Sequence, residues 1–393
     1  TEPTLSRMPF SKDHETETRN RIRVTGITQG VGFRPFVWRL AEQFSLSGWV
    51  QNDSSGVLSE VQGAQTDVAE CLASLRASPP QLARIDSVDV TELAPVAAPG
   101  AFTIRTSREQ PRESNPVTQD ISICADCHRE LTSPDDRRYH YPFINCTNCG
   151  PRFTIVEDLP YDRPATTMKS FRMCDRCQSE YDDPGDRRFH AQPNACPQCG
   201  PEVWLVTGDQ PSDAFIRTHM HSEQGADAID AFASAIRDGQ IIAAKGIGGF
   251  HLVCDAGNPN AVELLRERKG RVDKPFAVMA QSVEQASRFA LITVEEERLL
   301  ESKERPIVLL RKKRESGHEE LLHGVAPGND YIGVMLPYSP LHYLLVDSES
   351  PLVMTSGNIS EEPIVRTNEA VSYTHLRAHE TLGSISYAVF CLK

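Results

Sequence analysis

The feature that most constrains this chain is a pair of cysteine arrays with the same internal spacing. The first array consists of two Cys-x-x-Cys pairs separated by 18 residues: Cys124, Cys127, Cys146 and Cys149. The second array lies 50 residues further along with identical spacing: Cys174, Cys177, Cys196 and Cys199. The flanking residues repeat as well, because the string DRRYH at 136–140 returns as DRRFH at 186–190. The segment 121–202 is therefore an internal duplication.

This spacing predicts metal binding. Two residues between cysteines let one tight turn present both sulfurs to a tetrahedral ion, and two such turns close a site with Zn–S distances of about 2.3 Å. Four thiolate ligands leave no open position, so we expect two structural zinc ions. Redox-active Cys-x-x-Cys motifs are the alternative, which four motifs with duplicated spacing disfavour. Pairing within each repeat is the simpler arrangement, and swapped pairing stays open. His140 and His190 are interpreted as packing groups beside complete ligand sets.

Length and composition limit the remaining possibilities. A chain of 393 residues predicts two or three domains, and 39% hydrophobic with 24% charged residues is typical of soluble globular proteins. The net charge of -13 argues against a general nucleic-acid binder, which needs an excess of Lys and Arg. Residues 1–19 lack an apolar signal core and are expected to be a disordered leader. Cysteine thiolates without an export signal indicate the cytoplasm, and no apolar run suits a membrane span.

Residues 20–106 alternate between strand and helix periodicities. Extended segments at 21–25, 47–52, 57–62, 85–90 and 102–105 surround helical patterns at 33–44 and 67–78. The order β-α-β-β-α-β predicts a ferredoxin-like sandwich of two helices on one sheet. Residues 107–120 are polar and contain two prolines, so they are expected to form a linker.

A glycine-rich loop joins the first predicted strand to the first predicted helix. It contains Gln29, Gly30, Val31, Gly32 and Phe33. Glycines allow backbone N–H groups to converge on an anion at a helix N-terminus, where the helix dipole helps. Arg34 follows at once and can make a bidentate contact to phosphate. From this pattern alone, a plain turn remains an alternative.

The loop closely resembles the signature of acylphosphatases, and the string GWVQN at 48–52 resembles their second motif. The resemblance covers roughly residues 18–106. It implies hydrolysis of a mixed anhydride of a carboxyl group and phosphate, in which Arg34 binds the phosphate and Asn52 orients the attacking water. Positioning and charge stabilisation suffice for this reaction, because an acyl phosphate is already activated.

Residues 226–371 alternate between helices and strands, which predicts an α/β domain with a mostly parallel or mixed sheet. Five cations lie within nine residues and predict an anion site: Arg266, Arg268, Lys269, Arg271 and Lys274. The domain resembles the YrdC-like fold of threonylcarbamoyl-adenylate synthases, which implies ATP binding and acyl adenylation. The nucleotide-binding residues implied are Lys245, Lys269, Arg271, Lys274, Ser356 and Asn358, and Mg²⁺ is expected to accompany the ATP.

The combination defines a multidomain α+β protein: a ferredoxin-like acylphosphatase domain, a duplicated four-cysteine zinc-finger module and a YrdC-like domain. This order resembles the hydrogenase maturation carbamoyltransferases. The resemblance implies that carbamoyl phosphate is hydrolysed and that carbamate is adenylated with ATP. A further domain of the family passes the carbamoyl group to a C-terminal cysteine of a partner protein, for the cyanide ligand of [NiFe]-hydrogenase.

The resemblance stops near Val371, so the transferase domain of that family is expected to be missing. Residues 372–393 contain the string YTHLRAHET, which resembles translated sequencing-adapter read-through and is expected to be a non-native tail. Two other functions stay open. One is a zinc-scaffolded nucleic-acid-binding module, and the other is a threonylcarbamoyl-adenylate synthase with accessory domains.

Overall fold

The computed structural model describes residues 17–53, 55–80, 82–107, 118–205, 223–271, 273–313, 317–358 and 363–367. The chain forms two compact units, residues 1–118 with 157–166 and residues 119–156 with 167–393. Of the expected leader, residues 1–16 lie outside the described part, as does the expected tail at 372–393. Residues 17–19, which the sequence places in that leader, instead form the beginning of the first strand. Within the described part, no helix is long and apolar enough to cross a membrane.

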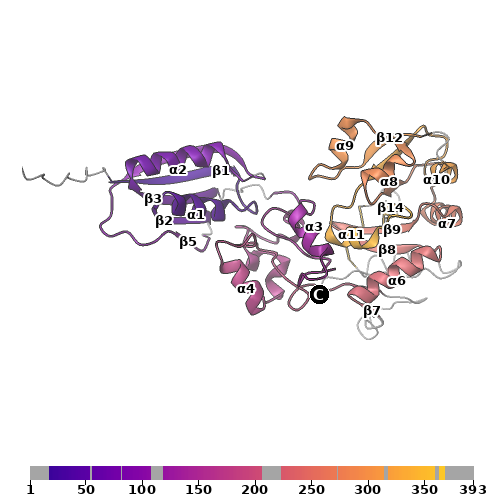
Figure 1. Ribbon diagram of the computed structural model, residues 1–393, viewed down its shortest axis with the longest axis horizontal. Helices are drawn as coiled ribbons and strands as arrows, with labels where there is room; N and C mark the ends of the chain where they lie inside the picture. Colours follow the sequence, from indigo (N-terminus) through magenta and orange to yellow (C-terminus); the bar gives the residue numbers. More distant parts are fainter. Residues whose placement is uncertain are drawn as a thin grey trace, which may run out of the picture. The chain divides into compact units, whose positions relative to one another are not determined.

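The first unit contains one five-stranded sheet in the order β4-β1-β3-β2-β5. Its elements are β1 (Glu17–Ile27), α1 (Phe33–Gln43), β2 (Ser47–Asp53), β3 (Gly56–Ala64), α2 (Gln65–Ala77), β4 (Arg84–Leu93) and β5 (Thr103–Ile104). The short β5 pairs parallel with β2, and the other pairings are antiparallel. The predicted β-α-β-β-α-β order and the ferredoxin-like sandwich are confirmed (Figure 1).

The alternation of side chains along β1 explains why both helices cover the same face. Ile22 and Val24 point into a core that also holds Val37 of α1 and Leu75 of α2. The intervening arginines point to the other face, where Arg19 and Arg21 both pair with the carboxylate of Glu60 on β3. The sheet is therefore apolar on one face and charged on the other, and both helices pack on the apolar face.

The duplicated module contributes one short helix per repeat, α3 (Ala125–Thr132) and α4 (Asp175–Asp182). Three 3-10 turns follow the first repeat: η1 (Phe153–Ile155), η2 (Arg163–Ala165) and η3 (Thr167–Ser170). Unusually large polar side chains are buried here, including Arg138 and Arg152 at 1% exposure each. Because so few apolar residues are available, hydrogen-bonded arginines occupy the interior in their place.

The C-terminal domain is built on a seven-stranded sheet in the order β11-β12-β13-β10-β14-β9-β8. Its strands are β8 (Ile242–Gly246), β9 (Gly249–Asp255), β10 (Ala277–Met279), β11 (Ala290–Leu291), β12 (Val308–Lys312), β13 (Tyr331–Met335) and β14 (Leu352–Ser356). Its helices are α6 (Ala226–Arg237), α7 (Pro259–Lys269), α8 (Val283–Ser287), α9 (Val294–Leu300), α10 (Glu319–Val325) and α11 (Pro340–Leu345). A two-stranded ribbon of β6 (Trp204–Leu205) and β7 (Glu223–Gln224) precedes them.

Helices cover both faces of this sheet. The apolar residues of α7, α8, α9 and α10 join one core cluster, and those of α6 and α11 join the other. The expectation of a mixed sheet is confirmed, but the expectation of mostly parallel strands is wrong. Among the described strands of this sheet, only the β10–β13 pair is parallel, and the other pairings are antiparallel. An alternation of helices and strands along the sequence does not distinguish a mostly parallel sheet from a mostly antiparallel one when some strands are joined by hairpins.

The clearest such hairpin lies at 245–252 and joins β8 to β9. Lys245 and Gly246 end β8, and β9 begins at Gly249, so two residues form the turn. Gly248 has a positive φ of 88°, as a tight hairpin turn requires. The short helices α10 and α11 were also missed, since six or seven residues carry too little periodicity to identify a helix.

Candidate functional site

Each cysteine array closes into one compact cluster of sulfurs. In the first, Sγ–Sγ separations are 3.7 Å for Cys124–Cys146, 3.8 Å for Cys146–Cys149 and 3.4 Å for Cys127–Cys149. Corresponding distances in the second cluster, formed by Cys174, Cys177, Cys196 and Cys199, are 3.7 to 3.8 Å. Disulfides need about 2.05 Å between sulfurs, whereas a tetrahedral zinc site with Zn–S of 2.3 Å separates them by about 3.8 Å. The donor sets therefore fit one tetrahedral metal ion each.

Local structure explains how the sulfurs converge. Cys124 is the N-cap of α3 and Cys127 lies in its first turn, so both sulfurs leave the same end of the helix. Cys146 and Cys149 bridge each other in a tight turn. The buried Arg152 holds this turn, because its guanidinium donates to the carbonyls of Cys146 and Cys149 at 3.0 Å each. Ligands group within each repeat, so the pairing that the sequence left open is the unswapped one.

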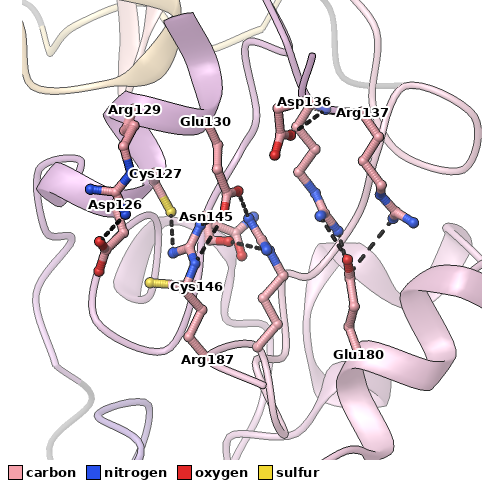
Figure 2. A network of polar contacts seen from close by, with 12 residues as sticks. Asp126, Cys127, Arg129, Glu130, Asp136, Arg137, Asn145, Cys146, Glu180 and Arg187 are labelled. Carbon is pink, nitrogen blue, oxygen red and sulfur yellow. Dashed lines mark hydrogen bonds and ion pairs between the residues drawn. The ribbon is translucent and has the colours of Figure 1, made fainter. Parts of the chain in front are cut away.

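The two repeats are joined by arginines that reach across to the other repeat (Figure 2). Arg137 of the first repeat donates to Cys177 Sγ at 2.6 Å, and Arg187 of the second donates to Cys127 Sγ at 2.9 Å. The next arginine in each repeat binds a carboxylate of the other. Arg138 makes a bidentate contact with Glu180, and Arg188 pairs with Glu130. We call these four arginines and two glutamates the cross-repeat clamp.

The arginine charges of the clamp act toward the thiolate form of Cys177, although burial keeps its pKa raised overall, and toward the carboxylate form of Glu180. Burial raises the pKa of the Cys177 thiol, while the charges of Arg138 and Arg137 act in the opposite direction. Burial would also raise the pKa of Glu180, but hydrogen bonding and charge from Arg138 leave it below its ordinary value. Thiolates are the form that binds a metal, so the clamp supports each metal site from the opposite repeat.

The predicted anion loop lies at the N-terminus of α1. Gly30 and Gly32 have φ values of 71° and 72°, a left-handed conformation that glycine adopts without strain. Gly32 is the N-cap, and no side chain among the described residues caps this helix. Val31 and Phe33 are buried in the core beneath the loop. The N-terminus of α1 therefore has the backbone geometry expected of an anion site.

Arg34 and Asn52 both lie buried at this site, at 7% and 1% exposure. Arg34 Nη2 lies 2.8 Å from Asp162 Oδ1, and Nη1 donates to Ser107 Oγ at 3.3 Å. Asn52 Oδ1 has no hydrogen-bond partner among the described residues. Gln29 connects the anion loop to the strand that carries Asn52, since its Nε2 donates to the carbonyl of the adjacent Asp53 at 2.7 Å. A buried amide oxygen in this position is able to accept a hydrogen bond from a bound water or ligand.

In the C-terminal domain, the structure brings together three of the predicted nucleotide residues from distant parts of the chain. Lys269 ends α7, and its Nζ donates to the carbonyls of Ser356 and Asn358 at 2.7 Å each. Ser356 Oγ in turn donates to Asn358 Oδ1 at 2.5 Å. Burial lowers the pKa of Lys269 to about 8, with further lowering from the charges of Arg271 and Lys274. The charges of Arg271 and Lys274 therefore act on Lys269.

The other predicted cations are placed differently. Lys245 lies on β8, two strands from Ser356, with its Nζ 5.3 Å from the ring centroid of Phe250. Arg271 is half-buried near the ring of Phe276, and Lys274 is exposed. Arg266 has a structural role, because it donates to the carbonyls of residues 324 and 325 at 2.7 to 2.9 Å. The cluster of five cations is thus only partly an anion site.

Sequence reasoning missed three residues, Asp162 near Arg34 and the histidine pair His251 and His342 near Ser356. Asp162 comes from the segment between the two fingers, 128 positions from Arg34, and no local pattern indicates it. His251 lies opposite Ser356 in the strand register, and its ring centroid is 6.4 Å from that of His342. Burial lowers the pKa of these histidines to about 4 and about 3, so both are neutral at physiological pH.

Comparison with family models reproduces the three-part organisation. The model described as Acylphosphatase matches residues 20–104, and the one described as HypF finger matches 123–156 and 173–206. The Sua5/YciO/YrdC model, described as Telomere recombination, matches 234–379. An acylphosphatase from Salinibacter ruber is 41% identical over 75 residues, which cover 19% of this chain and 79% of that protein.

Longer relatives cover nearly the whole chain. Carbamoyltransferase HypF2 of Cupriavidus necator is 45% identical over 378 residues, 92% of this chain and 45% of that protein. Carbamoyltransferase HypF of Rhodobacter capsulatus is 47% identical over 350 residues, 89% of this chain and 44% of the relative. A crystal structure of full-length HypF in a phosphate- and nucleotide-bound form aligns with TM-score 0.83 at 45% identity, covering 95% of this chain and 46% of that one.

The chain thus spans somewhat less than half the length of these relatives. Its acylphosphatase, finger and Sua5/YciO/YrdC domains follow one another along the chain, and sequence and structure agree over about nine-tenths of its residues. This chain belongs to the HypF carbamoyltransferase family.

Proposed function

We propose that this chain carries out the carbamoyl-activating steps of [NiFe]-hydrogenase maturation. It hydrolyses carbamoyl phosphate and uses ATP to convert the carbamate into carbamoyl adenylate, for transfer to a C-terminal cysteine of a partner protein. The observation that carries this proposal is the uncapped α1 N-terminus with buried Arg34 and Asn52, in a chain 45% identical to a HypF crystallised with phosphate and nucleotide.

The first step adds water to carbamoyl phosphate and yields carbamate and inorganic phosphate. Arg34 and the N–H groups of residues 30–33 bind the phosphoryl oxygens, where charge accumulates. Asn52 Oδ1, buried and without a partner among the described residues, accepts a hydrogen bond from the attacking water. A mixed anhydride needs no covalent nucleophile, so holding these groups in place supplies the catalysis.

The second step joins carbamate to the α-phosphorus of ATP, and pyrophosphate leaves. Lys269, Arg271 and Lys274 offset the negative charge of the triphosphate, while Ser356 and Asn358 bind through hydrogen bonds. We assign Lys245, on the neighbouring hairpin, to the same site. Mg²⁺ accompanies the nucleotide, as it commonly does where phosphates are transferred.

Each cysteine cluster holds one structural zinc ion in this proposal. Four thiolates complete a tetrahedral coordination, so the ion stabilises the fold of its repeat and takes no part in the two reactions. Reduced thiolates persist in a reducing compartment, which supports a cytoplasmic location.

Carbamoyl-phosphate hydrolysis and ATP–pyrophosphate exchange, each measured on the zinc-loaded chain, test the proposal. Exchange should depend on carbamoyl phosphate. The Arg34→Ala variant should lose phosphate release, about 100-fold or more, while zinc content is unchanged. Hydrolysis that persists in Arg34→Ala would remove the anion loop from the mechanism.

The Sua5/YciO/YrdC match favours one second candidate, a threonylcarbamoyl-adenylate synthase. Replacing carbamoyl phosphate by threonine and bicarbonate in the same exchange assay separates the two functions. Exchange that needs threonine would support the second candidate. The net charge of -13 disfavours a nucleic-acid-binding module, which salt-dependent binding to RNA would reveal.

A further inference from the structure

The guanidinium of Arg34 is oriented by groups that lie outside the acylphosphatase match. That match covers residues 20–104, and two hydrogen-bond partners of the guanidinium, Ser107 and Asp162, lie beyond it. The ion pair with Asp162 is largely shielded from water, since the two side chains are 8% and 23% exposed. All three residues belong to the first compact unit.

The position of Asp162 is determined by its neighbour on the same loop. Tyr161, only 1% exposed, donates its backbone N–H to Gln29 Oε1 at 2.9 Å. Thr118 Oγ1 donates to the carbonyl of Gln29 at 2.9 Å. Gln29 is itself tied to the strand that carries Asn52, through the carbonyl of Asp53. The segment 157–166 is therefore anchored to the anion loop beside the residue that binds Arg34.

A planar guanidinium presents five N–H donors in one rigid fork. Fixing Nη2 on a carboxylate and Nη1 on a hydroxyl sets the plane of the fork and thus the direction of the remaining donors. The carboxylate also compensates a charge that would be costly to bury alone. Catalysis by positioning is sensitive to this direction, because a misplacement of about 1 Å can cost about 100-fold in rate.

We propose that Asp162, on the segment between the two fingers, is a positioning residue for Arg34 in the acyl-phosphate site. The proposal deepens the proposed function and rests on it for the identity of the substrate. It makes the acyl-phosphate site a composite, in which the acylphosphatase fold supplies the loop, Arg34 and Asn52, and the inter-finger segment supplies the carboxylate. In the alternative role, the carboxylate of Asp162 competes with phosphate for Arg34 and must move away before phosphate binds.

The test compares Asp162→Ala and Asp162→Asn with Asp158→Asn, all in the zinc-loaded full chain. Asp158 is an exposed carboxylate in the same segment, so its variant controls for the lost charge. We expect kcat/KM for carbamoyl phosphate to fall about 100-fold in Asp162→Ala and about 10-fold in Asp162→Asn, which keeps one acceptor oxygen. The loss should include a higher KM and a higher inhibition constant for inorganic phosphate as well as a lower kcat, with Asp158→Asn, zinc content and thermal unfolding at wild-type values.

The same change made in an Arg34→Lys chain distinguishes a positioning role of Asp162 from a general loss of structure or activity. Lysine has no planar fork to orient, so in an Arg34→Lys chain the Asp162→Ala change should cost less than about twofold. An equal loss in both backgrounds, or unchanged kcat/KM in Asp162→Ala, overturns the proposal. A lower inhibition constant for inorganic phosphate in either Asp162 variant also overturns it, because that result identifies a competitor.

Failure of the proposed function can be distinguished from failure of the positioning role of Asp162. If the wild-type chain does not hydrolyse carbamoyl phosphate, calorimetric binding of inorganic phosphate replaces the kinetic readout. Positioning then predicts weaker binding in Asp162→Ala than in Asp158→Asn. Equal or tighter binding in Asp162→Ala, or no phosphate binding by the wild-type chain, overturns the positioning role as well.

Discussion

Removal of Arg138 should release the metal of the other repeat. Arg138 belongs to the first repeat, yet its guanidinium binds residues of the second: Cys177, Glu180, Asn194 and Ala195. The Arg138→Ala variant loses all of these contacts and leaves the half-buried Glu180 with a weaker partner, Arg137 at 3.6 Å. We therefore expect the ion held by Cys174, Cys177, Cys196 and Cys199 to become labile.

The magnitude follows from the burial of the pair. Removing one member of a buried ion pair typically costs about 3–5 kcal/mol, because the other charge stays uncompensated. The side chain of Glu180 is 19% exposed and Arg137 remains nearby, so the low end, about 3 kcal/mol, applies. At about 1.4 kcal/mol per factor of ten, the open form of the second repeat becomes roughly 100-fold more populated.

The assay is release of zinc from the loaded chain into a colorimetric chelator. One ion of two should leave Arg138→Ala roughly 100-fold faster than wild type, provided that release follows opening of the repeat. Arg129→Ala is the matched control, since Arg129 is 71% exposed and its pair with Asp126 contributes at most about 1 kcal/mol. Arg188→Ala should labilise the ion of the first repeat by the reciprocal argument. Wild-type release rates in both clamp variants would refute the coupling between repeats.

Three further predictions concern individual residues. Cys146→Ser should leave one zinc ion per chain by elemental analysis, because three thiolates and a hydroxyl bind zinc weakly; two retained ions would contradict the ligand assignment. Asn52→Ala should lower kcat for carbamoyl phosphate by about 10²-fold or more and leave the inhibition constant for phosphate nearly unchanged, because Asn52 orients water and Arg34 binds the anion. Equal effects on kcat and on the inhibition constant would exclude these separate roles. The pKa of Lys269 is lowered to about 8 from an ordinary 10.5, so between these values the folded chain binds fewer protons than the unfolded chain and stability rises with pH. Bound ATP favours the ammonium, so binding near about pH 9 should take up protons in calorimetry, and Lys269→Arg should abolish that uptake.

Much of this protein was determined by its sequence alone, wherever the deciding interactions are local. The Cys-x-x-Cys turns, the left-handed glycines before Arg34 and the alternation along β1 each depend on residues a few positions apart. Local geometry limits such patterns to few structures, so the two metal-binding repeats and the ferredoxin-like order could be predicted. The binding roles of the individual residues at the anion and nucleotide sites remain predictions that the experiments above test.

Tertiary structure decided what depends on contacts between distant segments. Local sequence does not reveal the unswapped cysteine pairing or the approach of Lys269 to Ser356, because each joins distant segments. It does not reveal the mainly antiparallel C-terminal sheet either, because strand periodicity is the same in either orientation. Arginine partners were the least predictable feature. A guanidinium on a long side chain can reach many carboxylates, and only packing selects Glu180 for Arg138 and Asp162 for Arg34.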